Sequence, residues 1–291
     1  MTSRGLVVWL NGQLVPADAA SVSVFDRGFR NGEGVFETFR SYQGHVFRLS
    51  DHLDRAYRGA EVLGFDPGPR DRLERAVTTT ATHNLEALQG GDGALRLTVT
   101  PGRLVPSSPF PGTPDAGTTV VVTAHPLAID VAIYRDGIAA VRVPLARELP
   151  HVKALSYLAP SLARAEARRR GAAEALLVDR EGRILEGASS NVFAVLDGAL
   201  VTPPVGAGIL PGVTRTVVLE QAQELGLQVR EEPLGSGLVG AADELFVTAT
   251  TREVVPVVRL DDSPVGDGTP GAVTKELHEA YRRAVDAERR P

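Results

Sequence analysis

Pro-His-Val-Lys-Ala-Leu-Ser-Tyr-Leu, at residues 150–158, places a lysine between a short apolar segment and a run of small, helix-forming residues. The lysine is Lys153, and only two of the chain's 31 lysines and arginines are lysines. Arginine carries positive charge almost everywhere else, although it is effectively never deprotonated. A partly buried lysine can lose its proton near neutral pH and become a nucleophilic amine that forms Schiff bases with carbonyl compounds.

The ordinary alternative for Lys153 is a side chain whose stem packs on apolar surface while its ammonium group reaches water. The other lysine, Lys275, illustrates this case. It lies in the charged segment 273–281, whose amphipathic pattern predicts a helix with Lys275 facing solvent. For Lys153 itself both interpretations stay open on position alone.

The composition narrows the class of protein. A length of 291 residues favours two domains, and 43% hydrophobic with 23% charged residues is typical of globular proteins. No apolar run reaches the ~18–20 residues of a membrane-spanning helix, and the start of the chain does not resemble a signal peptide. With no cysteine, disulfides, thiolate metal sites and cysteine nucleophiles are excluded.

The charge balance also argues against some partners. A net charge of −5 without a focused basic stripe disfavours nucleic acid, and the six histidines show no metal-ligand pattern. We therefore expect a soluble, cytoplasmic protein without a metal, whose chemistry is organic.

Turn signals and hydrophobic periodicity predict mixed strands and helices in the first half of the chain. We expect a hairpin around Asn11-Gly12 and a helix from a cap at Ser50 to about Leu63. A further helix is predicted at 69–85, and strands at 35–40, 95–100 and 118–124. Residues 101–117 contain five prolines and predict a long loop.

The second half continues the same alternation. Strands are predicted at 139–143, 174–179, 192–196, 228–232 and 244–248, and helices after Lys153, from 209 to about 226, and at the C-terminus. The order fits an α+β fold of two domains with mixed sheets. The predicted parts are an N-terminal domain at 1–125, an interdomain linker at 126–131, and a larger domain at 132–291 that carries Lys153.

Several residues could hold a phosphorylated cofactor. The segment 211–214 (Pro-Gly-Val-Thr) starts a predicted helix, where N–H groups and the helix dipole favour an anion. Thr250 adds a hydroxyl in a turn, and Arg55 adds a guanidinium. Glu186 could keep a pyridine nitrogen protonated and so make the ring an electron sink. Each has an ordinary explanation alone, but together with Lys153 they point to pyridoxal phosphate.

Three segments make the chain similar to a known family: 150–158, 185–193 (Leu-Glu-Gly-Ala-Ser-Ser-Asn-Val-Phe) and 210–215 (Leu-Pro-Gly-Val-Thr-Arg). In order and spacing they resemble the class IV (fold-type IV) pyridoxal-phosphate aminotransferases. That family includes branched-chain aminotransferase, D-amino acid aminotransferase, (R)-amine transaminase and aminodeoxychorismate lyase. The resemblance runs from Trp9 to about Ala284. It implies a small N-terminal α/β sandwich, a larger C-terminal pseudo-barrel domain, and a homodimer with active sites at the interface.

The resemblance also implies a role for each matching residue. Lys153 would be the Schiff-base lysine and proton shuttle, and Glu186 the partner of the pyridine nitrogen. The other cofactor residues would hold the phosphate, contact the ring oxygen, or surround the cofactor: Arg55, Val213, Thr214 and Thr250 for the phosphate, Tyr157 for the oxygen, and Ser189 in the surrounding shell. The residues bordering the substrate would be Phe36, Arg40, Arg96 and Thr251.

The departures from the family pattern concern the substrate. The D-amino acid enzymes carry an Arg-x-His carboxylate trap after the strand that ends at Thr100, but the nearest match here is Pro-Ser-Ser at 106–108, so the trap is absent. Bacterial branched-chain enzymes have a tyrosine where this chain has Asn31. Arg96 falls near a substrate-binding arginine of that subgroup, yet the lyases also have a basic residue there, so a structural role for Arg96 stays open.

Three functions follow as hypotheses. The first is an enzyme of amino acid metabolism, a transaminase that moves an amino group to a 2-keto acid through a Lys153 Schiff base, with a branched-chain, D-amino acid or (R)-amine donor. The second is an aminodeoxychorismate lyase, which would use Lys153 for elimination to 4-aminobenzoate and pyruvate. The third is a non-catalytic scaffold with the same fold, which would need neither Lys153 nor Glu186.

Overall fold

A computed structural model describes residues 5–88, 90–104 and 117–290 of the chain. The chain divides into two compact units, each with its own sheet and hydrophobic core. The first comprises Met1–Ala128 and Val152–Tyr157, and the second Ile129–His151 and Leu158–Pro291. Within the described ranges, no helix combines the length and the apolar character that crossing a membrane requires.

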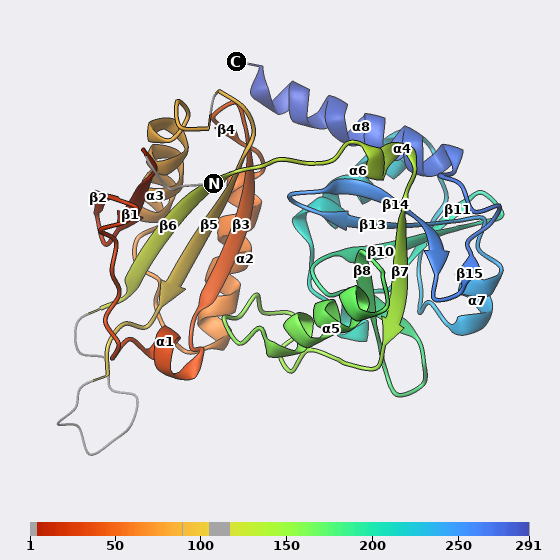
Figure 1. The fold of residues 1–291 in the computed structure, drawn as a ribbon, viewed down its shortest axis with the longest axis horizontal. Helices are drawn as coiled ribbons and strands as arrows, with labels where there is room; N and C mark the ends of the chain where they lie inside the picture. The colour runs from red at the N-terminus through yellow and green to blue at the C-terminus, as the bar shows by residue number, and fades with distance from the viewer. Residues whose placement is uncertain (1–4, 89, 105–116, 291) are drawn as a thin grey trace. The chain divides into compact units, whose positions relative to one another are not determined.

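The first unit is built on an antiparallel sheet whose described strands follow the order β2-β1-β6-β5-β3-β4 (Figure 1). Its strands are β1 (Val7–Leu10), β2 (Gln13–Pro16), β3 (Val35–Tyr42), β4 (His45–Val46), β5 (Gly93–Thr100) and β6 (Thr119–Pro126). The predicted hairpin joins β1 to β2, because Asn11 and Gly12 both adopt the positive φ that its tight turn needs.

Helices α2 (Leu49–Val62) and α3 (Arg70–His83) cover one face of this sheet (Figure 1). Leu53, Ala56 and Ala60 recur at helical spacing on α2 and are buried against the sheet. Val35 and Phe39 belong to the same core, and burying a side chain such as Leu53 contributes roughly 1.5–3 kcal/mol. Successive residues of a strand face opposite sides, so the even-numbered residues of β3 lie on the other face.

Two details of the first unit differ from the sequence predictions. Helix α2 begins at Leu49 with Arg48 at its N-cap, not with a cap at Ser50, whose hydroxyl instead accepts a hydrogen bond from Arg70 at 2.8 Å. The sequence also does not predict helix α1 (Arg27–Asn31), which Asp26 caps and which is too short to show a helical period. Residues 105–116 of the predicted loop, with the substrate-trap position at 106–108, lie outside the described residues.

The second unit contains a mixed, curled sheet whose described strands run β12-β11-β10-β13-β14-β7-β8-β9, with β15 paired to β14. Its strands are β7 (Ile138–Val143), β8 (Glu174–Val178), β9 (Ile184–Gly187), β10 (Asn191–Leu196), β11 (Ala199–Thr202), β12 (Val229–Glu231), β13 (Glu244–Ala249), β14 (Glu253–Leu260) and β15 (Ser263–Pro264). β7 is parallel to both β8 and β14, and β11 is parallel to β12. β8, β9 and β10 are buried along almost their whole length, so they read as apolar runs rather than as alternating patterns.

Helices pack around this second sheet (Figure 1). They are α4 (Ala132–Arg135), α5 (Leu158–Arg169), the 3-10 turn η1 (Val205–Ala207), α6 (Val213–Glu224), α7 (Ser236–Gly240) and α8 (Ala272–Arg289). Helix α8 is the predicted amphipathic C-terminal helix, with Leu277, Tyr281 and Val285 buried at helical spacing and Lys275 exposed. The α+β prediction is thus confirmed in both units.

The division between the units falls between Ala128 and Ile129, inside the linker predicted at 126–131. The segment Val152–Tyr157 groups with the first unit, whereas the sequence placed Lys153 in the C-terminal domain. The physical reason is that this segment pairs with β3, as described below. The assignment of 1–125 to a small N-terminal domain and of 132–291 to a larger C-terminal domain stays a prediction.

Candidate active site

Lys153 lies in a short extended segment that pairs with the beginning of β3. Ala154 forms an antiparallel bridge with Val35, and Phe36 N donates a hydrogen bond to Lys153 O at 2.9 Å. Val152 and Ala154 are both buried in the hydrophobic core of the first unit. Since neighbouring residues of an extended segment face opposite sides, the side chain of Lys153 points away from this core.

A glycine allows this pairing. Leu155 N donates to Gly34 O at 2.9 Å, just before β3 begins. Gly34 has a φ of 142°, and a Cβ atom there would overlap Val99 O on β5. Only glycine therefore fits between the Lys153 segment and β5.

Three of the predicted site residues lie around the ring of a fourth, Phe36. Lys153 Nζ lies 4.7 Å from the ring centroid, and Arg96 Cζ lies 3.7 Å from it. The Tyr157 ring meets Phe36 edge to face, with centroids 5.4 Å apart. Burial lowers the pKa of Arg96, although the Tyr157 and Glu37 side chains oppose this effect. The first unit thus presents an amine, a guanidinium and a phenol around one aromatic ring.

Arg55 lies on the opposite, helix-covered side of β3, in a buried ion cluster with Glu37 and His52. Its Nε and Nη2 atoms donate to the two carboxylate oxygens of Glu37 at 2.7 and 2.6 Å, and His52 Nδ1 lies 2.8 Å from the same carboxylate. Burial alone would raise the pKa of Glu37, but Arg55 and His52 outweigh it and lower this pKa to about 2. Burial lowers the pKa of His52. Glu37 therefore fixes the orientation of the Arg55 guanidinium.

Arg40, predicted to border the substrate, is paired within the protein. Its Nη2 atom donates to Asp92 at 2.7 Å, and its guanidinium stacks on Tyr42, 4.6 Å from the ring centroid. The side chain of Arg40 is 6% exposed, so the ion pair with Asp92 is largely shielded from water. Asp92 and Tyr42 thus hold the Arg40 guanidinium, and its predicted role beside the substrate stays a prediction.

In the second unit, Glu186 on β9 is a buried carboxylate. It accepts a hydrogen bond from Leu210 N at 3.0 Å, and Arg147 Nη1 lies 3.5 Å from its other oxygen. Both neighbours give this buried carboxylate polar partners, which a buried charge requires. The sequence does not predict Arg147, because its partner is far away in the chain and the surrounding loop carries no turn or helix signal.

Helix α6 begins at Val213, as the prediction of a phosphate site requires. Its N-cap, Gly212, provides no side-chain hydrogen bond, so the helix leaves N–H groups at Val213 and Thr214 without a capping side chain. A Cβ atom at Gly212 would overlap Asn191 Oδ1, while Asn191 Nδ2 donates to Leu210 O at 2.9 Å. Asn191 therefore anchors the chain immediately before the helix.

The remaining predicted residues lie in two turns of the second unit. Ser189 is exposed in the β9–β10 turn, next to the buried Ser190. Thr250 and Thr251 are partly exposed in the turn between β13 and β14. Their positions are compatible with contact to a ligand, and their roles stay predictions.

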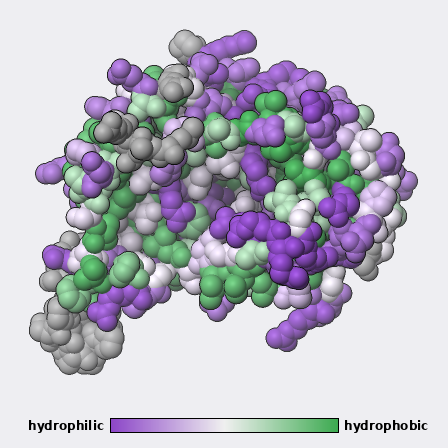
Figure 2. Space-filling model, viewed as in Figure 1, coloured by the Kyte–Doolittle hydropathy of each residue, from purple (hydrophilic) through white to green (hydrophobic). Residues whose placement is uncertain are grey.

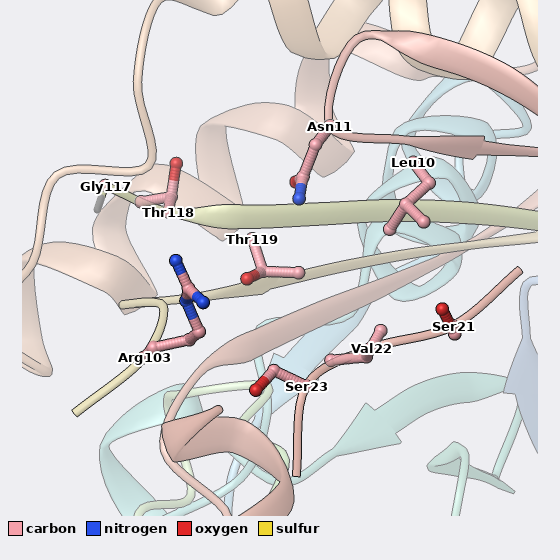
Figure 3. A pocket seen from close by; sticks show the side chains of 9 residues that line it. All are labelled: Leu10, Asn11, Ser21, Val22, Ser23, Arg103, Gly117, Thr118 and Thr119. Carbon is pink, nitrogen blue, oxygen red and sulfur yellow. The ribbon is translucent and has the colours of Figure 1, made fainter. Parts of the chain in front are cut away.

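A cavity of about 330 Å³ lies elsewhere in the first unit (Figure 3). It is lined by polar side chains such as Asn11, Ser21, Thr118 and Thr119, and by the exposed Arg103. No predicted site residue lines it, so its shape does not bear on the predicted chemistry.

The Amino-transferase class IV family model matches residues 34–260. The chain belongs to the class IV aminotransferase family. This match spans most of both units and includes every predicted site residue. The chain is accordingly an enzyme of a family that transfers amino groups and uses pyridoxal phosphate, which confirms the family, fold-type and transamination predictions.

Individual class IV aminotransferases are similar over nearly the whole chain. A putative branched-chain-amino-acid aminotransferase of Methanocaldococcus jannaschii is 38% identical over 288 residues, covering 94% of this chain and 95% of the relative. A D-alanine aminotransferase of Bacillus licheniformis is 33% identical, covering 97% and 98%. Among solved structures, the branched-chain aminotransferase of the thermophilic archaeon Thermoproteus uzoniensis with norvaline has a TM-score of 0.86 at 31% identity, covering 98% and 96%.

Proposed function

We propose that this enzyme is a pyridoxal-phosphate-dependent transaminase in which Lys153 is the nucleophile and proton carrier. The observation that carries the proposal is the position of Lys153. Its backbone is pinned to β3, and its amine lies over Phe36 beside Arg96 and Tyr157. Lys275, the other lysine, is exposed on α8.

The residues present fit the cofactor. The uncapped start of α6 offers N–H donors for a phosphate, and Arg55 offers a guanidinium whose orientation Glu37 fixes. Glu186 offers a buried carboxylate that can accept a hydrogen bond from a protonated ring nitrogen. Tyr157 offers a phenol for the ring oxygen. When bound, pyridoxal phosphate supplies an aldehyde and an electron-accepting ring.

The proposal assigns these residues different tasks in the reaction. Lys153 Nζ would take the proton from the substrate Cα and return it, which is the role of a general base. Arg96 faces the same ring as Lys153 and binds the carboxylate of the amino donor and of the keto acid in turn. The turn at Thr251 supplies further donors to that carboxylate. Glu186 keeps its negative charge in place through both half-reactions.

For the amino donor, we propose an amino acid of modest size. The relatives quoted above are named for branched-chain amino acids and for D-alanine. Arg96 supports an amino acid over a plain amine, because a guanidinium over Phe36 can recognise a carboxylate. L-leucine, L-valine and D-alanine are thus the donors to compare, with 2-oxoglutarate and pyruvate as acceptors.

The test follows the visible absorption of the cofactor-loaded enzyme while single donors are added. A transaminase loses its visible band with some donor and regains it when a keto acid is added. If no amino acid or amine changes the band but aminodeoxychorismate yields pyruvate and an aromatic amine, the protein is a lyase and the proposal fails.

We also propose a homodimer. Val24, Phe25 and Phe29, in and next to α1, are 63%, 52% and 74% exposed. Figure 2 shows apolar side chains at the surface of the first unit around α1. Three large neighbouring apolar side chains in water are typical of a surface that another chain covers. The cytoplasmic location expected from the composition stays a prediction.

The dimer is tested by light scattering after size exclusion. The wild type should have twice the chain mass of 30.8 kDa, and Phe29→Glu should shift it toward the monomer. Val62→Glu, at a residue 65% exposed on α2, is the matched control and should remain dimeric. A monomeric wild type would refute the assembly.

A further inference from the structure

The turn that joins β13 to β14 has an unusual residue at its end. Arg252 N donates to Ala249 O at 3.1 Å, and Ala249 pairs with Glu253 across the hairpin. Glu253 has a φ of 57°, in the left-handed region. Glu253 is the first residue of β14, and a left-handed conformation there favours glycine because a side chain is strained.

The Glu253 side chain accounts for this choice. The residue is 1% exposed, and its two carboxylate oxygens lie 2.8 Å from His278 Nε2 and 2.8 Å from Arg282 Nη1. His278 and Arg282 are four residues apart, so they lie on one face of α8. The His278 ring also stacks on Tyr134 at 4.4 Å. The strained turn is thus tied to the C-terminal helix through a buried carboxylate.

The preceding residue of the turn is tied to a second buried carboxylate. Arg252 pairs with Glu174 on β8, which is 2% exposed. The same oxygen of Glu174 accepts a hydrogen bond from Ser190 at 3.0 Å, in the β9–β10 turn. Two successive residues, Arg252 and Glu253, are therefore anchored to different elements of the second unit. Thr250 and Thr251 are the part of the turn that these anchors leave partly exposed.

We infer that Glu253 is a positioning residue, which holds the Thr250–Thr251 turn in the one geometry that can bind a phosphate and a carboxylate. This inference rests on the proposed function, which gives Thr250 to the cofactor phosphate and Thr251 to the substrate. A glycine at 253 would satisfy the backbone equally well, so the glutamate is explained by what its carboxylate holds. Glu253 would act through the turn, because its buried carboxylate is held by His278 and Arg282.

The decisive variant is Glu253→Gly, because it removes the anchor and relieves the backbone strain together. We expect a folded enzyme whose dissociation constant for pyridoxal phosphate, measured by titrating the apo-enzyme, rises about tenfold, the equivalent of about 1.4 kcal/mol. The KM of donor and acceptor should rise by a similar factor while kcat changes less. His278→Gln combined with Arg282→Gln removes the same anchor from α8 and should have the same effect.

The matched control is Asp197→Gly. Asp197 is an exposed acidic residue with a φ of 50° in the β10–β11 hairpin, far along the strand from the predicted site residues. This substitution relieves similar strain without touching an anchor, so cofactor affinity and both KM values should stay at wild-type levels. Glu253→Gln keeps the side-chain length and should fall between wild type and Glu253→Gly.

Two outcomes separate this inference from the proposed function. If the wild type transaminates and Glu253→Gly keeps its cofactor affinity and KM values, the positioning role is wrong and the function stands. If the wild type neither binds pyridoxal phosphate nor transaminates, the proposed function fails. Hydrogen exchange then decides the inference: faster exchange of the amides of residues 250–252 in Glu253→Gly supports the anchor, and unchanged exchange overturns it.

Discussion

Charged side chains on the two faces of β3 have different surroundings. On the helix-covered face, Glu37 is fully buried and satisfied by Arg55 and His52, so its charge is neutralised within the protein. On the other face, Phe36 has two cationic groups, Lys153 and Arg96, over or beside its ring. The carboxylate of Glu37 is thus fully paired within the protein, whereas Lys153 and Arg96 lie around an aromatic ring, and Arg55 belongs both to the buried cluster and to the proposed phosphate site. Substitution of Glu37 should therefore reduce mainly the stability of the protein, and substitution of Lys153 or Arg96 mainly its activity.

Lys153→Ala should produce the largest effect. Removing the amine removes both nucleophile and proton carrier, so transamination should fall by ~10⁴-fold or more. The visible band of the loaded enzyme should disappear while circular dichroism and the melting temperature stay near wild type. Lys275→Ala is the control and should keep band and activity. The reverse pattern for the two lysines would refute the assignment.

Glu37→Gln should act on stability. Breaking a buried ion pair on one side leaves Arg55 without its full partner, which typically costs about 3–5 kcal/mol. Chemical denaturation should show this loss in the free energy of unfolding. A loss of unfolding free energy smaller than about 1 kcal/mol would mean that water or a rearranged His52 replaces the lost ion pair.

The pH dependence of stability checks the same cluster. The pKa of Glu37 is about 2 in the folded protein, below its ordinary value of 4.5. A lowered folded-state pKa contributes stability that is fully present above pH 4.5 and is lost as the pH falls toward 2. Glu37→Gln should therefore flatten the acid limb of the stability curve between these values. If the decrease in stability at acid pH is the same in Glu37→Gln and wild type, other carboxylates cause the acid unfolding.

Glu186→Gln also alters a buried carboxylate, but we expect it to reduce activity more than stability. Glutamine keeps the shape but removes the negative charge that should face the ring nitrogen, so the half-reaction with donor should slow by ~10²–10³-fold. Stability should change far less than in Glu37→Gln, and the cofactor should still bind. Stopped-flow measurement of a single turnover would show this, and a wild-type rate would exclude the electronic role.

Arg96→Gln and Arg40→Gln should give the smallest and most specific difference. Losing a charged hydrogen bond of about 1.5–3 kcal/mol predicts that Arg96→Gln raises KM for donor and keto acid by at least tenfold. Arg40 is paired with Asp92, so its substitution should lower the melting temperature instead. Steady-state kinetics together with thermal unfolding distinguish the two. A larger KM effect in Arg40→Gln would exchange their roles.

Local patterns predict local structure in this chain. The Asn11-Gly12 hairpin and the apolar spacing of α2 and α8 can be predicted from the sequence, because turns and amphipathic helices depend on residues that are close together in the chain. Lys153 stands out because lysine is so rare here.

Pairings between distant residues could not be predicted in the same way. Arg147 meets Glu186 across 39 positions, and Arg252 meets Glu174 across 78. The positive φ of Glu253 also could not be predicted, because glutamate rarely adopts this conformation and no neighbouring residue indicates it. The sequence therefore predicts which residues have distinctive chemistry. The partners that orient these residues can be identified only from the folded structure, because they are distant in sequence.

The pairing of residues 152–157 with β3 has a consequence for synthesis of the protein. The first unit includes the segment Val152–Tyr157, which is synthesised after residues Ile129–His151 of the second unit. Until residue 154 is synthesised, Val152 and Ala154 are missing from the core, and Val35 is paired only with Val99 of β5. A nascent chain ending at Ala128 would thus expose an unfilled apolar edge, so the first unit completes its fold only after translation of the second has begun.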